Sequence, residues 1–429
     1  MLNADCDNST RLRSAAPGGP TLAEWLDWQL QLHPHSIELE LERVQKVAAR
    51  LDVLPLAARC VIVAGTNGKG SCVRLLETLL RARGQRVGAY TSPHLWRYNE
   101  RIRIDGADAD DAALCTAFAA VEEARQEVQL TFFEYGTLAA LWLFQQAELD
   151  FALLEVGLGG RLDAVNIVDA EVALITNIGL DHTAWLGDTR AAIGLEKAGV
   201  MRADQAVVCT DKDLPRTVSG HAAVIGADLY RLEREFAIDA QGWHGWAGRQ
   251  VSWSARLPAH VLPENLAGVL AVMALLGQWP LSATVVMQAC QAQSGLHGRR
   301  EVIEQDGLSL IFDVAHNVEA VTVLAQSLRD NPVAGATHIV LGMLADKPVR
   351  RVARLLLPLA DHVYAADLAE ISERGLDAAA LAQQCGCGAR PAGPPAAALA
   401  AAKTAAKVGD RIVVCGSFFT VAHARMEPE

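Results

Sequence analysis

The sequence has little positive charge, no long apolar run and, apart from Cys385 and Cys387, no cysteines close together. Its 38 lysines and arginines are outnumbered by 50 aspartates and glutamates, which gives a net charge of −12. A nucleic-acid surface needs clustered cations, so we expect no nucleic-acid partner. No apolar run is long enough for a membrane span and no secretory signal begins the chain, so no membrane partner is expected either. The nine scattered cysteines argue against a disulfide framework or a zinc site, and favour a soluble protein in the reducing cytoplasm.

The length of 429 residues predicts two or three domains. We interpret residues 1–20 as a disordered tail. Beyond it, strand-like apolar runs alternate with longer helical patterns, which is typical of βαβ units and a parallel sheet. Short alternating segments over 231–260 predict a small antiparallel excursion. We therefore expect two α/β domains, one over residues 21–296 and one over 297–429. The strands that we expect are Val61–Ala64, Val87–Tyr90, Phe151–Val156, Val172–Ile178, Ala206–Cys209, Leu308–Val314, His338–Leu344, His362–Ala365 and Arg411–Cys415.

The stretch Val61–Ser71 carries three glycines, a lysine and a serine between an apolar run and an amphipathic helical pattern. Glycines let consecutive backbone N–H groups and a helix N-terminus face one anion. Lys69 adds a positive charge for phosphate oxygens, and Ser71 adds a hydroxyl for Mg²⁺. The spacing differs from that of the usual P-loop, and an ordinary turn between strand and helix is the alternative. The combination favours phosphate binding.

Further polar residues of the first half lie near strand ends. A carboxylate such as Glu155, beside a phosphate loop, suits Mg²⁺, and the alternative is an ion pair with Arg161. Ser92 precedes a proline, which either projects its hydroxyl toward a ligand or makes a simple turn. Histidine is an unusual ligand of Mg²⁺, so hydrogen bonding is the default role of His182. By its spacing alone, Lys197 is interpreted as a surface lysine of a helix.

A second polar group follows the strands of the other half. Asp313, His316 and Asn317 close one apolar strand and open a helix, where they could meet a ligand in an interdomain cleft. Helix capping is the alternative for the Asp and the Asn. Arg299 could clamp a phosphate or be a solvated linker residue. Ser417 follows the last strand, and a plain turn from strand to helix is its alternative role.

Eight motifs then make the chain recognisable. They are Gly65–Gly70, Ser92–Leu95, Phe133–Thr137, Glu155–Asp163, Leu180–Thr183, Glu196–Gly199, Phe312–Asn317 and Cys415–Phe418. In this order they resemble the dihydrofolate synthase/folylpolyglutamate synthase family of the Mur ligase superfamily. The resemblance implies an N-terminal P-loop ATPase-like parallel-sheet domain, a smaller C-terminal Rossmann-like α/β domain and an active site between them. It also implies a monomeric ligase that uses ATP and Mg²⁺ to add L-glutamate to dihydropteroate and to reduced folates.

The resemblance implies a role for each matching residue. The ATP contacts would be Thr66, Asn67, Gly68, Lys69, Gly70, Ser71, Asn265, Arg299 and Asp313. The sites for two Mg²⁺ ions would comprise Ser92, Glu155, His182 and Lys197, with Lys197 carrying a carbamate derived from CO₂. The pterin contacts would be Gln31, Leu32, His33, Pro34, Thr131, Phe132, Phe133, Glu134, Leu162, Asp163 and Ala164. We interpret His316 and Ser417 as candidates for the glutamate side, and Lys69, Lys197 and His316 as the catalytic candidates.

The implied chemistry passes through an acyl phosphate. An amide forms from a carboxylate only after the acyl group has been activated, because O²⁻ cannot leave. The substrate carboxylate would therefore attack the γ-phosphate of ATP, and the amine of glutamate would displace the phosphate. Two alternatives stay open, namely a Mur-type ligase for a cell-wall nucleotide precursor and a non-catalytic nucleotide-binding switch.

Overall fold

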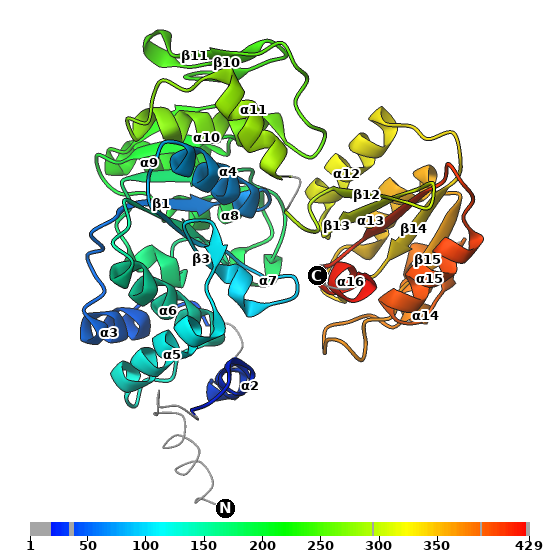
Figure 1. The fold of residues 1–429 in the computed structure, drawn as a ribbon, viewed down its shortest axis with the longest axis horizontal. Coiled ribbons are helices and arrows are strands. Elements are labelled where there is room, and N and C mark those ends of the chain that lie inside the picture. Colours follow the sequence, from blue (N-terminus) through cyan, green and yellow to red (C-terminus); the bar gives the residue numbers. More distant parts are fainter. Residues whose placement is uncertain (1–18, 34–37, 294–295, 387, 426–429) are drawn as a thin grey trace, which may run out of the picture. The chain divides into compact units, whose positions relative to one another are not determined.

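A computed structural model describes residues 19–33, 38–293, 296–386 and 388–425 (Figure 1). The chain divides into two compact units. The first comprises Met1–Arg256 and Leu262–Cys290, and the second comprises Leu257–Val261 and Gln291–Glu429. Most of the predicted tail, residues 1–18, and the predicted pterin contact Pro34 lie outside the described residues.

The first unit is built on a sheet with the strand order β4-β3-β2-β5-β1-β6-β7-β8. Its strands are β1 (Arg59–Ala64), β2 (Val87–Tyr90), β3 (Ile102–Ile104), β4 (Ala107–Asp108), β5 (Phe151–Glu155), β6 (Val172–Ile175), β7 (Ala206–Cys209) and β8 (Asp228–Arg231). The strands from β2 across to β8 are parallel, and β3 and β4 add an antiparallel edge. The carboxyl ends of the parallel strands therefore share one edge, where ligands of such sheets bind.

Helices cover both faces of this sheet. They are α2 (Leu22–Leu32), α3 (Glu42–Leu51), α4 (Lys69–Ala82), α5 (Asp111–Arg125), α6 (Phe132–Gln146), α7 (Thr183–Leu186), α8 (Arg190–Ala198), α9 (Arg216–Ile225), α10 (Pro263–Leu275) and α11 (Ala283–Ala292). Alternate strand residues point to opposite faces, so Ile62 and Ala64 of β1 join the core beneath α5, α6, α8 and α9. Helices α4 and α10 pack together on the other face (Figure 1).

Short elements complete the first unit. Three turns of 3₁₀ helix are η1 (Tyr98–Arg101), η2 (Ala164–Ile167) and η3 (Trp246–Gly248). The predicted antiparallel excursion is the small sheet β11-β10-β9, formed by β9 (Ala237–Ile238), β10 (Gly242–His244) and β11 (Gln250–Ser252). Buried Trp243 anchors this sheet, because its indole N–H donates to the Ala267 carbonyl of α10 at 3.1 Å.

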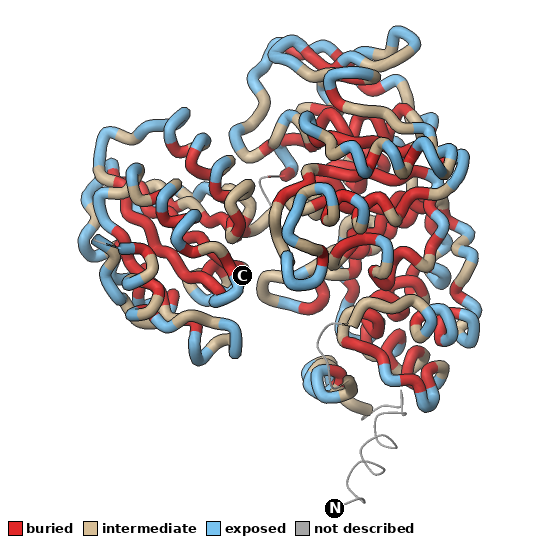
Figure 2. The backbone as a smooth tube through the Cα atoms, turned by 180° about the vertical axis from the view of Figure 1, so that it is seen from behind, coloured by how far each residue is buried: buried red, intermediate tan, exposed pale blue. Residues whose placement is uncertain are grey.

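The second unit has a sheet in the order β12-β13-β17-β14-β15-β16. Its elements are β12 (Glu301–Gln305), β13 (Leu308–Asp313), α12 (Val318–Asp330), β14 (Thr337–Leu341), α13 (Val349–Leu356), η5 (Leu357–Leu359), β15 (His362–Ala365), α14 (Ala378–Cys385), β16 (Ala389–Pro391), α15 (Pro395–Ala405), β17 (Arg411–Cys415) and α16 (Phe418–Ala424). Only β12 pairs antiparallel among these described strands. The inner strands are buried while the outer surfaces of the helices are exposed (Figure 2).

The predicted α/β class is confirmed in both units, and most expected strands lie at or within two residues of the observed bounds. The clearest errors are the runs His338–Leu344 and Val172–Ile178, because β14 ends at Leu341 and β6 ends at Ile175. The next two residues leave the ladder, since the Thr176 hydroxyl and the Asn177 carbonyl bond to the loop after β1. In the part of the chain that the structure describes, no helix combines the length and apolarity needed to cross a bilayer.

Candidate active site

The Gly-rich loop connects β1 to α4 at the carboxyl edge of the first sheet. Gly65 has a φ of +142°, and a Cβ there would collide with the Thr176 hydroxyl. Gly68, with a φ of +85°, precedes α4 as its N-cap residue and offers no capping side chain, and the Asn265 amide packs against its Cα. Lys69 is the first residue of α4, and Ser71 lies in its first turn. The N-terminus of α4 is therefore shaped for an anion, because backbone N–H groups and the helix dipole favour negative charge there.

Two lysine amines converge on one carbonyl of this loop. Lys69 Nζ donates to the Gly65 carbonyl at 3.1 Å, and Lys197 Nζ donates to the same oxygen at 3.0 Å. Lys197 is only 4% exposed, so the interpretation of it as a surface lysine is wrong. Burial, assisted by the charge of Lys69, lowers the pKa of Lys197 to about 7. A neutral amine is thus accessible to Lys197 near neutral pH.

The carboxylate of Glu155 lies beside the same loop. It ends β5, is 3% exposed and accepts the Ser92 backbone N–H at 3.1 Å. A Cβ built on Gly70 would lie 3.4 Å from Glu155 Oε2, which places the carboxylate next to the first turn of α4. The alternative ion pair with Arg161 is wrong, because Arg161 bonds Glu196 at 2.9 Å.

The residues at this edge fit a hard divalent cation. Among the described residues, no three His, Cys, Asp or Glu side chains gather into a metal-holding group. Mg²⁺ requires no such cage, since it binds one or two carboxylates and keeps water and phosphate oxygens. Glu155 offers carboxylate oxygens and Ser92 a hydroxyl oxygen as metal ligands. The two residues lie side by side, because the Ser92 backbone N–H donates to the Glu155 carboxylate. His182 follows β6 and precedes α7 with a φ of +50°.

The predicted pterin residues on α6 have local structural partners. Thr131 and Glu134 form a capping box, in which the Thr131 hydroxyl accepts the Glu134 N–H and the Glu134 carboxylate accepts the Thr131 N–H. Arg43 donates to Glu134 at 2.9 Å and pairs with Glu38 at 3.1 Å. Glu38 also contacts His33 at 3.0 Å. This chain of polar contacts brings two predicted substrate segments together, the end of α2 and the start of α6.

Another part of the predicted pterin set surrounds the loop after β5. The Phe133 ring packs against Gly157 and lies 5.7 Å from the Tyr90 ring. Asp163 is buried and accepts the Leu158 N–H at 2.8 Å, and burial raises the pKa of its carboxyl to about 7. The other predicted pterin residues are Gln31, exposed on α2, Leu32, packed against the core, Phe132, whose ring lies beneath the Arg101 guanidinium, Leu162, which is half-buried, and Ala164, which is buried.

The candidates of the second unit gather around Phe418. The Arg299 guanidinium lies 5.1 Å from the Phe418 ring, and the His316 ring lies 6.3 Å from it. Asp313 is buried at the end of β13, and burial raises the pKa of its carboxyl, an effect that Arg299 opposes. The Ser417 hydroxyl caps α16 by accepting the Thr420 N–H at 3.0 Å. These groups lie at the carboxyl edge of the second sheet.

Capping is confirmed for part of that polar group, since Asn317 caps α12 by accepting the Ala320 N–H at 2.9 Å. The Asp313 carboxylate instead accepts the N–H of Ala315, which lies before α12, at 2.8 Å and so does not cap a helix. Capping does not account for His316, whose Nδ1 lies 2.8 Å from the Val314 carbonyl.

Sequence reasoning missed residues that support the Gly-rich loop. Thr176 and Asn177 bond it directly, and Asp181 is close enough to influence the pKa of Lys197. Their position after a parallel strand was a usable signal. For Thr176 and Asn177 it is hidden because the expected strand runs to Ile178, which makes these two residues part of the strand itself.

Two α/β units, one with an anion-shaped loop beside a buried lysine and a carboxylate, fit a nucleotide-binding protein of the Mur ligase class. In agreement, residues 298–418 match the family model "Mur ligase, glutamate ligase domain". The chain belongs to the dihydrofolate synthase/folylpolyglutamate synthase family. It is 43% identical to the dihydrofolate synthase/folylpolyglutamate synthase of Escherichia coli, over 94% of each chain.

Solved structures agree with this assignment. The fold is similar to that of E. coli FolC in complex with DHPP and ADP, with a TM-score of 0.89, 42% identity and coverage of 96% of this chain and 97% of that chain. A bifunctional folylpolyglutamate synthase/dihydrofolate synthase with Mn, AMPPNP and L-glutamate bound gives a TM-score of 0.88 at 42% identity, with coverage of 96% and 98%.

Proposed function

We propose that this chain is an ATP-dependent ligase that adds L-glutamate to dihydropteroate, giving dihydrofolate, and to folates, giving folylpolyglutamates. The observation that carries the proposal is the convergence of the Lys69 and Lys197 amines on the Gly65 carbonyl, beside the buried carboxylate of Glu155. A phosphoryl-transfer site needs cations and backbone donors around the phosphates. Relatives of similar length that carry both activities in their names support the choice of substrates.

The first step is attack of the substrate carboxylate on the γ-phosphate of ATP, which yields an acyl phosphate and ADP. Residues Thr66–Ser71 bind and orient the phosphates through backbone N–H groups at the start of α4. Lys69 offsets negative charge on the transferring group. Such a step depends on positioning and electrostatics, because the protein supplies no covalent chemistry.

Ser92, Glu155, His182 and a carbamylated Lys197 are the residues that would hold magnesium. The bound ions would neutralise charge on the phosphate oxygens and polarise them as Lewis acids. Lys197 can carry the carbamate because its neutral amine is favoured by burial, and the carbamate converts a cation into an anion. A relative solved with Mn and AMPPNP supports a requirement for a divalent metal.

The second step is attack of the glutamate amine on the acyl carbon, followed by loss of phosphate. The segments at the end of α2, the start of α6 and the loop after β5 would hold the pterin part of the substrate. His316 and Ser417 would orient glutamate, and Asn265, Arg299 and Asp313 would contact ATP. The gathering of Arg299 and His316 around Phe418 supports assigning these two residues to a common site in the second unit.

The decisive experiment incubates purified protein with ATP, Mg²⁺, glutamate and dihydropteroate. ADP release should depend on dihydropteroate, and mass spectrometry should detect dihydrofolate. Lys69→Ala should abolish the reaction, whereas Lys46→Ala, which removes an exposed lysine paired with Glu127, should not. ADP release only with a cell-wall nucleotide precursor would favour a different Mur-type ligase. Nucleotide binding without ADP release on either substrate would favour a binding switch.

A further inference from the structure

The segment after β6 is the direct support of the Gly-rich loop. Asn177 accepts the Thr66 N–H through its carbonyl and the Asn67 N–H through its side chain, both at 2.8 Å. Gly179 donates its N–H to the Thr66 hydroxyl at 2.9 Å, and the Thr176 hydroxyl donates to the Asn67 carbonyl at 2.7 Å. The position of the loop therefore depends on where this segment is held.

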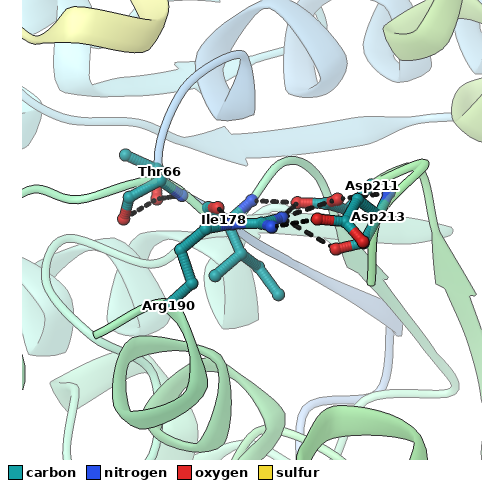
Figure 3. Close-up of polar contacts among 6 residues, drawn as sticks. Thr66, Ile178, Arg190, Asp211 and Asp213 are labelled. Atoms are coloured by element: carbon teal, nitrogen blue, oxygen red, sulfur yellow. Dashed lines mark hydrogen bonds and ion pairs between the residues drawn. The ribbon is translucent and has the colours of Figure 1, made fainter. Parts of the chain in front are cut away.

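Ile178 lies between Asn177 and Gly179, and other residues hold both its backbone N–H and its carbonyl. Its carbonyl accepts Arg190 Nε at 2.7 Å, and its N–H donates to Asp211 Oδ2 at 2.7 Å. The Arg190 guanidinium also bonds both oxygens of Asp211 at 3.0 Å and Asp213 at 2.6 Å (Figure 3). One residue is thus clamped on both sides, its N–H by a carboxylate and its carbonyl by an arginine.

The clamp joins three elements that meet at this edge of the sheet. Arg190 is the first residue of α8, the helix that carries Lys197, and Asp211 lies two residues after the end of β7. Asp211 has only 9% of its surface exposed, and it also accepts the Asp213 N–H at 2.9 Å, so its carboxylate is fixed in place. A planar guanidinium with several donors suits this arrangement, and a lysine cannot reproduce it.

We propose that Arg190, together with Asp211, is a positioning residue for nucleotide binding, because the pair holds Ile178 and thereby sets the Asn177 and Gly179 contacts to Thr66 and Asn67. This inference rests on the proposed function, since it takes the Gly-rich loop to be the phosphate site. Neither residue needs to touch the nucleotide. A misplacement of about 1 Å in a site that binds by geometry lowers its efficiency by up to about 100-fold.

The test measures ADP affinity by calorimetry and the Michaelis constants in the ligase assay. Arg190→Ala should weaken ADP binding about tenfold or more and raise the KM for ATP, with the KM for dihydropteroate unchanged. Arg190→Lys and Asp211→Asn should give smaller losses, because each retains part of the clamp. Hydrogen exchange of the peptide covering 176–182 should also become faster in Arg190→Ala, in proportion to the loss of ADP affinity.

Arg59→Ala is the matched control. Arg59 begins β1 at the opposite edge of the same sheet and makes a two-bond ion pair with Glu171, with a side-chain exposure of 40% against 35% for Arg190. Its loss should lower thermal stability but leave ADP affinity unchanged.

The inference is overturned if Arg190→Ala binds ADP like the wild type, or if Arg59→Ala weakens ADP binding equally. If Arg190→Ala does not fold, wild-type ADP affinity in both Arg190→Lys and Asp211→Asn overturns it. ADP binding is measured without the other substrates. An inactive wild-type protein would therefore refute the proposed ligase function and leave this test valid.

Discussion

The buried amine of Lys197 leads to a prediction about pH and bicarbonate. Its pKa is lowered from 10.5 to about 7 by burial and by the charge of Lys69. At about pH 8 roughly 90% of such amines are neutral, against less than about 1% for an ordinary lysine, and at about pH 6 the neutral share falls to roughly 10%. Only the neutral amine reacts with CO₂. Carbamylation of Lys197, and with it turnover, should therefore rise with pH through about 7.

The same shift fixes the sign of a stability effect. The folded state binds this proton less tightly than the unfolded state. The unfavourable contribution of charged, uncarbamylated Lys197 is therefore fully present below about pH 7, and it decreases as the pH rises toward 10.5.

The assay uses protein dialysed into CO₂-free buffer. Near pH 8, added bicarbonate should restore turnover, and carbon-13 bicarbonate should give one protein-bound carbamate resonance. Both effects should be much weaker near pH 6. Lys197→Arg should abolish turnover and the resonance, because arginine keeps the charge but does not carbamylate. In contrast, Lys46→Ala, at an exposed lysine, should retain both. Turnover that does not change when bicarbonate is added, or a carbamate resonance that persists in Lys197→Arg, would refute the carbamylation of Lys197.

Four further substitutions test other parts of the site and fold. Glu155→Gln keeps an oxygen acceptor but removes a charge, so kcat should fall at least about 100-fold. Activity is measured as a function of Mg²⁺ concentration, and a curve like that of the wild type would contradict the metal role of Glu155. His316→Ala should raise the KM for glutamate or lower kcat, and unaltered values in steady-state kinetics would remove His316 from the glutamate side. Gly65→Ala introduces a collision at a φ of +142°, so calorimetry should detect no ADP binding, and wild-type affinity would show that the loop tolerates a side chain. Glu77→Gln removes the charged partner of buried Arg103, so the free energy of unfolding in urea should fall by about 3–5 kcal/mol, whereas a fall below about 1 kcal/mol would mean that the pair contributes little.

Much of the phosphate region could be predicted because it is local in sequence. An apolar run that ends in a Gly-rich turn and a helix places Lys69 and Ser71 at a helix start by chain geometry alone. Glu155 was accessible by the same logic, since carboxyl ends of parallel strands share an edge. The sequence could not show that its partner is the Ser92 backbone rather than Arg161, because that contact joins residues far apart in the chain.

Lys197 shows why the rest could not be predicted from pattern. It follows Glu196 in a helix of ordinary polarity, and a lysine in that setting is usually solvated. The structure buries it because the loop after β5 packs directly onto the α8 backbone, where a Cβ on Gly160 would lie 3.0 Å from the Lys197 Cα. That approach depends on tertiary packing, so only the resemblance to a known family pointed to the lysine.

Side chains at helix starts present a different problem, because one oxygen can serve a cap or a ligand. Thr131 and Ser417 were predicted as substrate contacts, and both accept backbone N–H groups as N-caps. A cap also fixes where its helix begins, so it determines the position of neighbours such as Phe133 and Phe418. A capping role therefore does not argue against a place in the site. The two alternatives separate in kinetics, because loss of a cap lowers stability and all substrate affinities together, whereas loss of a direct contact changes the Michaelis constant of one substrate.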